Sequence, residues 1–139
     1  MARVRLELPD DLPFTTELTV RVTDLNYGGH VGNDTILAFA HEARAQFLAS
    51  HGLQELDVDG RGIIIADAVV VYRAESFFGE RLRVSLGAGD FNKYGCDIFY
   101  RFEKEDATEV ARAKTGLVFF DYGARRIAKA PEAFLALFR

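Results

Sequence analysis

Hydrophobic and polar positions along the chain first alternate and then take up the spacing of a helix. From residue 14 to residue 22 the side chains alternate and are rich in Thr and Val, which predicts a first strand. Over residues 35–50 apolar side chains recur at helical spacing and continue round much of the other side. Because a helix that is apolar nearly all round is usually buried, we expect this helix at the centre of the fold.

After the helix the pattern is that of strands. A loop with several breaker residues covers positions 53–62, and segments with strand patterning follow at 63–74, 81–91, 96–103 and 109–122. A short terminal helix is predicted from Pro131, since proline is favoured in a first turn. Strands and helices do not alternate as in parallel βαβ units. The sequence therefore predicts an α+β fold with an antiparallel sheet wrapped round the helix, in one domain spanning residues 1–139.

Composition and charge narrow the class of protein. A hydrophobic content of 49% and a charged content of 27% match a soluble globular domain. The formal net charge of -4 argues against a nucleic-acid partner. No segment approaches the ~18 continuous apolar residues of a membrane span. The N-terminus also lacks the apolar stretch of a signal peptide, so we expect a cytoplasmic protein with no membrane partner.

Cysteine and histidine usage argues against a metal centre. Cys96 is the single cysteine, which excludes an internal disulfide and a cysteine-based zinc cluster. The three histidines, His30, His41 and His51, do not have the spacing of a metal-ligand pair. We therefore expect no metal, and any catalysis has to depend on carboxylates, amides, an imidazole and backbone N–H groups.

A polar turn rich in glycine joins the first strand to the helix, between Asp24 and Asp34. Glycine has no Cβ, so such a turn lets the backbone approach a ligand closely. Asn33 or Asp34 is the predicted helix N-cap. The open N–H groups at a helix start favour a negative charge or a polarised carbonyl, so N–H groups around Gly32 and Asn33 are predicted oxyanion donors.

Three side chains of the turn are candidate catalytic groups. His30 suits general-base work because an imidazole titrates near neutral pH, although it can also cap a backbone group. Asn26 does not titrate, but its amide can orient water, donate to an oxyanion or form an Asx-turn. Asp24 is expected to hold the turn by accepting from N–H groups or by orienting His30.

Glu42, on the predicted helix, is a fourth candidate. In an apolar setting its carboxylate would polarise water at the site. The alternative is a carboxylate that points to solvent or joins a local ion pair. Periodicity leaves both interpretations open.

Three stretches, Asp24-Leu25-Asn26, Gly29-His30-Val31-Gly32-Asn33 and Glu42-Ala43-Arg44, form a pattern. It resembles the hotdog-fold thioesterases of the 4-hydroxybenzoyl-CoA thioesterase type. The resemblance implies a five-stranded antiparallel sheet round the long helix. It implies hydrolysis of thioesters of coenzyme A or acyl carrier protein without a metal or organic cofactor. It also implies a homodimer, often paired into a homotetramer, with sites at the subunit interface.

Two positions depart from the family pattern. Asn26 stands where the family commonly has its catalytic Asp, and Gly32 stands where the family often has Asn. The plant acyl-carrier thioesterases have Asp-x-Asn followed by His at a shorter spacing, which supports roles for Asn26 and His30. Two alternatives to a thioesterase therefore remain open: a hotdog dehydratase or hydratase, and a noncatalytic acyl-thioester binding protein.

Coenzyme A carries phosphates, and a chain of net charge -4 has to concentrate basic groups to hold them. The sequence offers many candidates and distinguishes none of them: Arg73, Arg81, Arg83, Lys93, Arg101, Lys114, Arg125, Arg126 and Lys129.

Overall fold

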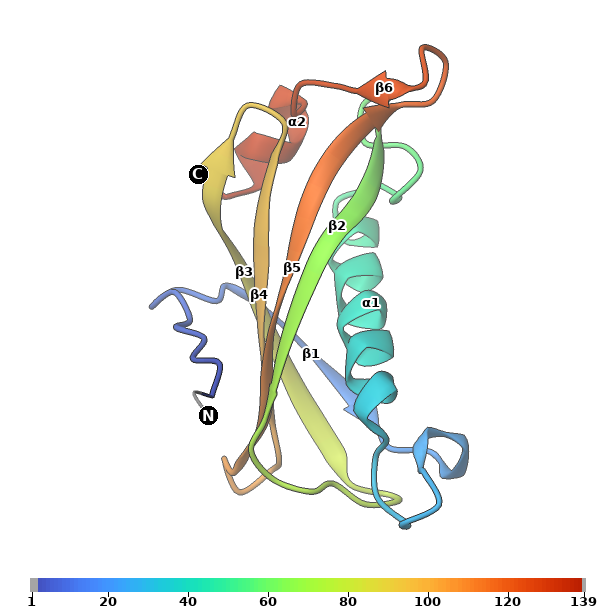
Figure 1. Ribbon diagram of the computed structural model, residues 1–139, viewed down its shortest axis with the longest axis vertical. Coiled ribbons are helices and arrows are strands. Elements are labelled where there is room, and N and C mark those ends of the chain that lie inside the picture. The colour runs from blue at the N-terminus through green and yellow to red at the C-terminus, as the bar shows by residue number, and fades with distance from the viewer. Residues whose placement is uncertain (1–2, 139) are drawn as a thin grey trace.

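A single sheet wraps round one long helix in the computed structural model, which describes residues 3–138 (Figure 1). The sheet has the order β1-β3-β4-β5-β2, every neighbouring pair is antiparallel, and a short β6 pairs with β5. The predicted α+β fold is confirmed. The elements in chain order are β1 (Phe14–Thr19), the 3₁₀ turn η1 (Val22–Asp24), α1 (Asn33–Ala49), β2 (Gly62–Tyr72), β3 (Arg81–Asn92), β4 (Gly95–Glu103), β5 (Glu109–Asp121), β6 (Arg126–Ile127), α2 (Glu132–Leu135) and η2 (Ala136–Phe138).

The core lies between the concave face of the sheet and α1. Alternate residues of β4 point inward, so Cys96, Ile98, Tyr100 and Phe102 are fully buried. Ala40 and Ala43 of α1 are also fully buried, and their small side chains let the helix backbone approach the sheet. Burying one large apolar side chain contributes about 1.5–3 kcal/mol, so this face of α1 is fixed by packing. The helix members of the core are Ile36, Phe39, Ala40, Ala43, Phe47 and Leu48.

The opposite face of α1 is open in the single chain, which corrects the expectation of a helix buried all round. Leu37, Ala38, His41, Glu42, Ala45 and Ala49 are exposed. The many small apolar residues on this face had hidden the boundary between the core face and the solvent face.

The start of α1 also differs from the prediction. The helix begins at Asn33, and its N-cap is Gly32, not Asn33 or Asp34. The Thr35 N–H donates to the Gly32 carbonyl at 3.1 Å, and no side chain caps the first turn. The first strand ends at Thr19, because η1 follows almost at once and takes Val22 out of extended geometry.

The remaining predicted elements are present with shifted ends, and β6 is an addition. The terminal helix begins at Glu132, with Pro131 as its N-cap. The five-stranded sheet implied by the resemblance gains β6, because a turn that holds Arg125 at φ 57° brings the chain back onto β5. None of the helices among residues 3–138 is both long and apolar enough to span a membrane.

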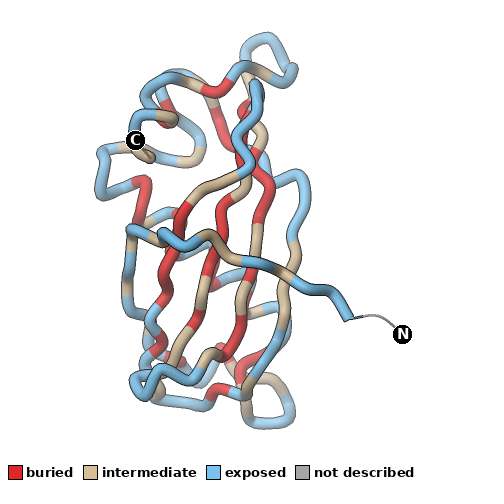
Figure 2. The backbone as a smooth tube through the Cα atoms, turned by 90° about the vertical axis from the view of Figure 1, so that its left-hand side faces the viewer, coloured by how far each residue is buried: buried red, intermediate tan, exposed pale blue. Residues whose placement is uncertain are grey.

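The N-terminal segment, residues 3–13, crosses the outer face of the sheet (Figure 2). The Arg112 guanidinium on β5 donates to the Leu6 carbonyl at 2.9 Å. A Cβ at Gly87 on β3 would lie 2.6 Å from the Asp11 carbonyl oxygen, so only glycine admits the segment at this point. Sequence patterning had predicted no more than a lead-in for these residues.

Candidate active site

The polar turn folds as a tight hairpin in front of α1. Leu25 and Val31 form an antiparallel bridge, and the Asn26 N–H donates to the His30 carbonyl at 2.9 Å. The Gly29 N–H donates to the Asn26 carbonyl at 3.1 Å, and Gly29 has φ 79°, a conformation that favours glycine. The glycine-rich sequence therefore places Asn26 directly opposite His30.

Asp24 anchors the entry to this hairpin. Its buried carboxylate accepts from the Arg21 N–H at 2.8 Å and from the Arg21 guanidinium at 3.1 and 3.3 Å. Burial opposes ionisation of Asp24, but these bonds and the charge of Arg21 together lower its pKa. The predicted turn-holding role is thus visible, although the partner of the carboxylate is Arg21 and not His30.

Asn26 and His30 meet beside Gly28. The Asn26 Oδ1 and the His30 Nε2 each lie 3.3 Å from the position that a Cβ at Gly28 would occupy. The Oδ1 accepts from the Gly28 N–H at 2.9 Å, which makes an Asx-turn and leaves the Asn26 Nδ2 group as a donor. The His30 Nδ1 bonds the Val31 carbonyl at 3.1 Å. Since a carbonyl only accepts, Nδ1 carries the hydrogen, and a neutral His30 presents the lone pair of Nε2.

The start of α1 completes one side of the site. The Gly32 N–H donates to the Asp24 carbonyl at 3.2 Å, so Gly32 shapes the backbone and is not available as the predicted oxyanion donor. The N–H groups of Asn33 and Asp34 have no acceptor within the helix. Tyr72 fixes the first turn from β2, because its hydroxyl donates to the Asn33 carbonyl at 2.8 Å.

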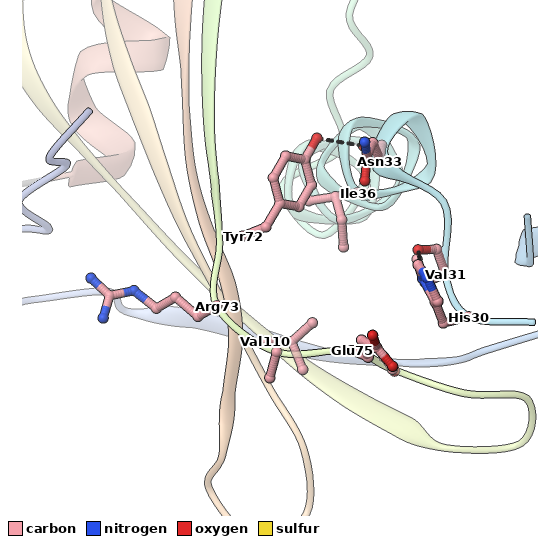
Figure 3. A pocket seen from close by; sticks show the side chains of 10 residues that line it. His30, Val31, Asn33, Ile36, Tyr72, Arg73, Glu75 and Val110 are labelled. Atoms are coloured by element: carbon pink, nitrogen blue, oxygen red, sulfur yellow. Dashed lines mark hydrogen bonds between the residues drawn. The ribbon is translucent and has the colours of Figure 1, made fainter. Parts of the chain in front are cut away.

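A cavity of about 240 Å³ lies between the hairpin, the first turn of α1 and the chain that follows β2 (Figure 3). The Val31 N–H donates to the Ser76 carbonyl at 2.8 Å and ties the hairpin to the 73–80 loop. The lining residues are His30, Val31, Asn33, Ile36, Tyr72, Arg73, Ala74, Glu75, Ser76 and Val110.

Glu42 belongs to a second cavity, of about 530 Å³, between β1 and α1. Its carboxylate is exposed and accepts from the Gln46 side chain at 2.7 Å. Within one chain the structure thus brings together Asn26, His30 and Asn33 and separates Glu42 from them. Asp24 and Arg21 line this second cavity as well.

Tyr72 and Glu75 are site residues that the sequence did not reveal. Glu75 stands just after a strand and before the Phe78-Gly79 turn, a context in which carboxylates are ordinary. The long-range bond between Val31 and Ser76 brings it to His30. The signal available from sequence was a polar residue at a strand end, which did not connect it to the hairpin.

Arg44, the last residue of the Glu-x-Arg pattern, has a structural position. Its buried guanidinium donates to Glu55 at 2.7 Å and to the Tyr100 hydroxyl at 3.0 Å, and Tyr100 bonds Thr115 at 2.8 Å. The network links α1, the loop after it, β4 and β5 beneath the helix.

Neither a metal centre nor a cysteine nucleophile is apparent. Among residues 3–138 no three His, Cys, Asp or Glu side chains are grouped so as to hold a metal ion. Burial, with a contribution from the charge of Asp97, raises the pKa of the Cys96 thiol to about 12, which keeps it protonated and unreactive.

Sequence comparison assigns this chain to a protein family. A family profile described as Thioesterase-like superfamily matches residues 20–138. The chain belongs to the thioesterase-like superfamily. The matched region of this thioesterase-like chain includes the hairpin, α1 and the whole sheet after β1. A comparison with curated proteins found no significant match.

Solved structures similar to this thioesterase-like chain confirm the hotdog fold. Slr0204, a 1,4-dihydroxy-2-naphthoyl-CoA thioesterase from Synechocystis, is 26% identical, with a TM-score of 0.81 over 88% of this chain and 93% of its own. Protein TT1821 from Thermus thermophilus is 25% identical, with a TM-score of 0.79 over 88% and 95% of the two chains. Protein SAV2348 from Staphylococcus aureus, solved in complex with CoA, is 21% identical and shares the fold, with a TM-score of 0.80 over 88% and 79%.

Proposed function

We propose that this protein hydrolyses an acyl-CoA thioester to a free acid and the thiol of coenzyme A. The observation that carries the proposal is that the His30 Nε2 and the Asn26 amide oxygen both lie 3.3 Å from the Cβ position of Gly28, next to the start of α1. Membership of the thioesterase-like superfamily and the similarity to Slr0204 support coenzyme A as the thiol carrier. An acyl-carrier-protein thioester is the alternative form of the same substrate.

His30 is the general base of the proposed reaction. The Nδ1 bond to the Val31 carbonyl orients the ring, so the Nε2 lone pair takes a proton from the attacking water. The water oxygen bonds to the acyl carbon, the C–S bond breaks, and the Nε2 proton passes to the sulfur of the departing thiolate. The net change is one water consumed and one acid and one thiol formed.

The donors for the carbonyl oxygen are the Asn26 Nδ2 group and the N–H groups at the start of α1. Asn26 lies beside that start, since its Cβ is 3.7 Å from the position a Cβ at Gly32 would take. Removing one such donor typically costs about 10²–10³ in turnover. The helix dipole adds to the stabilisation of negative charge there.

The reaction needs no metal or organic cofactor, since coenzyme A enters as part of the substrate. We infer a homodimer or homotetramer, because β1 and β2 end the sheet as unpaired edges and one face of α1 is open. In such an assembly Glu42 of a partner chain is the candidate carboxylate for the site, and a cytoplasmic location remains a prediction.

A panel of acyl-CoA and acyl-carrier thioesters, assayed for free thiol, tests the function. We expect thiol release, and His30→Ala should lower turnover by about 10²-fold or more while leaving the thermal unfolding midpoint unchanged. Hydration of an enoyl substrate without thiol release would indicate a dehydratase or hydratase. Tight binding with neither reaction would indicate a noncatalytic binding protein.

A further inference from the structure

Glu75 is the neighbour of His30 across the two loops that form the cavity. The Val31 N–H donates to the Ser76 carbonyl at 2.8 Å. This bond sets the His30-Val31 segment beside the Glu75-Ser76 segment. Glu75 and His30 both line the cavity of about 240 Å³. Figure 3 shows the two side chains on the same side of this cavity, with Tyr72 and Asn33 across from them.

The loop that carries Glu75 is held in place. The Arg73 and Ala74 N–H groups both donate to the Val110 carbonyl, at 2.8 and 3.1 Å. Ser76 is buried, and the Gly79 N–H donates to the Val20 carbonyl at 2.9 Å. These bonds fix the backbone that carries Glu75, whose exposed side chain lies at the cavity.

Among the carboxylates near the cavity, Glu75 is available for chemistry. It makes no hydrogen bond and no ion pair within residues 3–138, whereas Asp24 is bound by Arg21. Glu80 accepts from the Phe77 N–H at 2.6 Å. The Asp34 carboxylate lies over Gly32, with its Oδ1 2.8 Å from the position of a Cβ there.

Arg73, which also lines the cavity, does not neutralise Glu75. Its guanidinium is 3.8 Å from the Glu109 carboxylate. In Figure 3 the Arg73 side chain points away from Glu75 and His30. Glu75 therefore lines the cavity as a carboxylate that is not paired with Arg73.

We propose that Glu75 is a catalytic carboxylate of this chain, which holds the attacking water together with His30. The inference rests on the proposed thioesterase function. One O–H of the water donates to the Glu75 carboxylate and the other to the His30 Nε2, which takes the proton as the oxygen bonds to the acyl carbon. Glu75 stays ionised throughout and stabilises the imidazolium until its proton passes to the thiolate sulfur.

This role of Glu75 compensates for the Asn that stands at position 26 in place of the family's Asp. An amide at Asn26 serves the oxyanion and cannot act as a base. The carboxylate that the resemblance implies in the hairpin is supplied here from the 73–80 loop, so Glu75 of the same chain takes the place of Glu42 of a partner chain as the candidate carboxylate.

Glu75→Gln tests the assignment by separating kcat from KM in the thiol-release assay. We expect a kcat about 10²-fold lower with an unchanged KM, because the lost interaction acts on the water and not on the bound substrate. Glu105→Gln is the matched control, since Glu105 lies in the exposed β4–β5 turn and pairs with Arg81 at 2.8 Å. Glu75→Asp keeps a carboxylate and should retain more activity than Glu75→Gln.

Combining Glu75→Gln with His30→Ala gives a readout that a merely structural role would not change. Two groups that hold one water act as a unit, so the double variant should lose little beyond the worse single variant. A Glu75→Gln variant with wild-type kcat, or independent additive losses, would overturn the assignment and leave the proposed function standing. A wild-type protein that releases no thiol from any thioester would overturn both.

Discussion

The side-chain amide of Asn26 has two separate roles, one as an acceptor within the hairpin and one as a donor in the proposed reaction. Its oxygen accepts from the Gly28 N–H at 2.9 Å, and its nitrogen is the oxyanion donor of the proposed reaction. Asn26→Asp keeps the acceptor, removes the donor and adds a negative charge where the oxyanion develops. We expect turnover to fall by about 10²-fold in the thiol-release assay. Increased turnover would instead show that a carboxylate at position 26 acts as the catalytic carboxylate that the resemblance implies.

Gly28 and Gly29 give a matched pair of substitutions. Gly28→Ala puts a Cβ 3.3 Å from both the Asn26 Oδ1 and the His30 Nε2, so it should lower kcat several-fold with little change in stability. Gly29→Ala meets no atom within 4 Å, but φ 79° is strained for alanine. It should lower the free energy of unfolding by about 1 kcal/mol, with kcat retained. Kinetics and urea denaturation of both variants check this, and equal effects on kcat would contradict it.

The catalytic candidates found from sequence are those whose signal is local. Asn26, His30 and Asn33 lie in one short polar stretch, so the sequence revealed them together. Glu75 was not found, because long-range hydrogen bonds, Val31 to Ser76 and Tyr72 to Asn33, bring its loop to His30. The engaged N–H of Gly32 depends in the same way on three-dimensional geometry.

Among the elements, α1 is held to the sheet by a buried charge as well as by apolar packing. Arg44→Met should leave Glu55 and the Tyr100 hydroxyl without their shared donor. Breaking a fully buried pair typically costs about 3–5 kcal/mol, and because the Glu55 side chain is 23% exposed we expect a loss of stability below that range, which urea denaturation would measure. Arg83→Met is the control, because Arg83 is half exposed and 3.9 Å from Glu103. Similar losses in both variants would argue against a special role for the buried network.

The hairpin should make stability depend on acid pH through Asp24. The pKa of Asp24 is lowered in the folded protein from an ordinary value of 3.8, so its ionised form favours folding. That contribution is present above the ordinary value and is lost as the pH falls below it. We expect Asp24→Asn to lower the thermal midpoint at neutral pH and to narrow its gap to wild type as the pH falls toward the acid range. Asp10→Asn serves as the control, and a gap constant with pH would contradict the role of Asp24.

Periodicity predicted the strands and the helix well, because alternation and helical spacing report directly on burial. It failed at the ends. The N-cap at Gly32 has no capping side chain to identify it, and β6 is two residues long. The solvent face of α1 escaped notice because alanines occupy it as readily as they occupy the core face.

The whole molecule leaves surfaces that a second copy would cover. β2 ends the sheet, and Ile64, Ile65 and Tyr72 on it are 36%, 37% and 50% exposed. We expect light scattering at micromolar concentration to report a dimer or larger species, since unpaired edges and an open helix face favour association. A mass of 15.5 kDa would contradict this expectation. Sequence patterning cannot say which surface pairs, because core and contact side chains are alike.

The segment that crosses the outer face of the sheet adds a third layer to the domain. It has three layers, with α1 on the concave face of the sheet, the sheet in the middle and residues 3–13 as a strap across its outer face (Figures 1 and 2). Gly87 lets the strap pack directly on the sheet, because it has no side chain beneath the strap. In any assembly that packs two such sheets with their outer faces together, the two N-terminal straps would contact each other before the strands did. The spacing of the two sheets would then be set by residues outside the sheet.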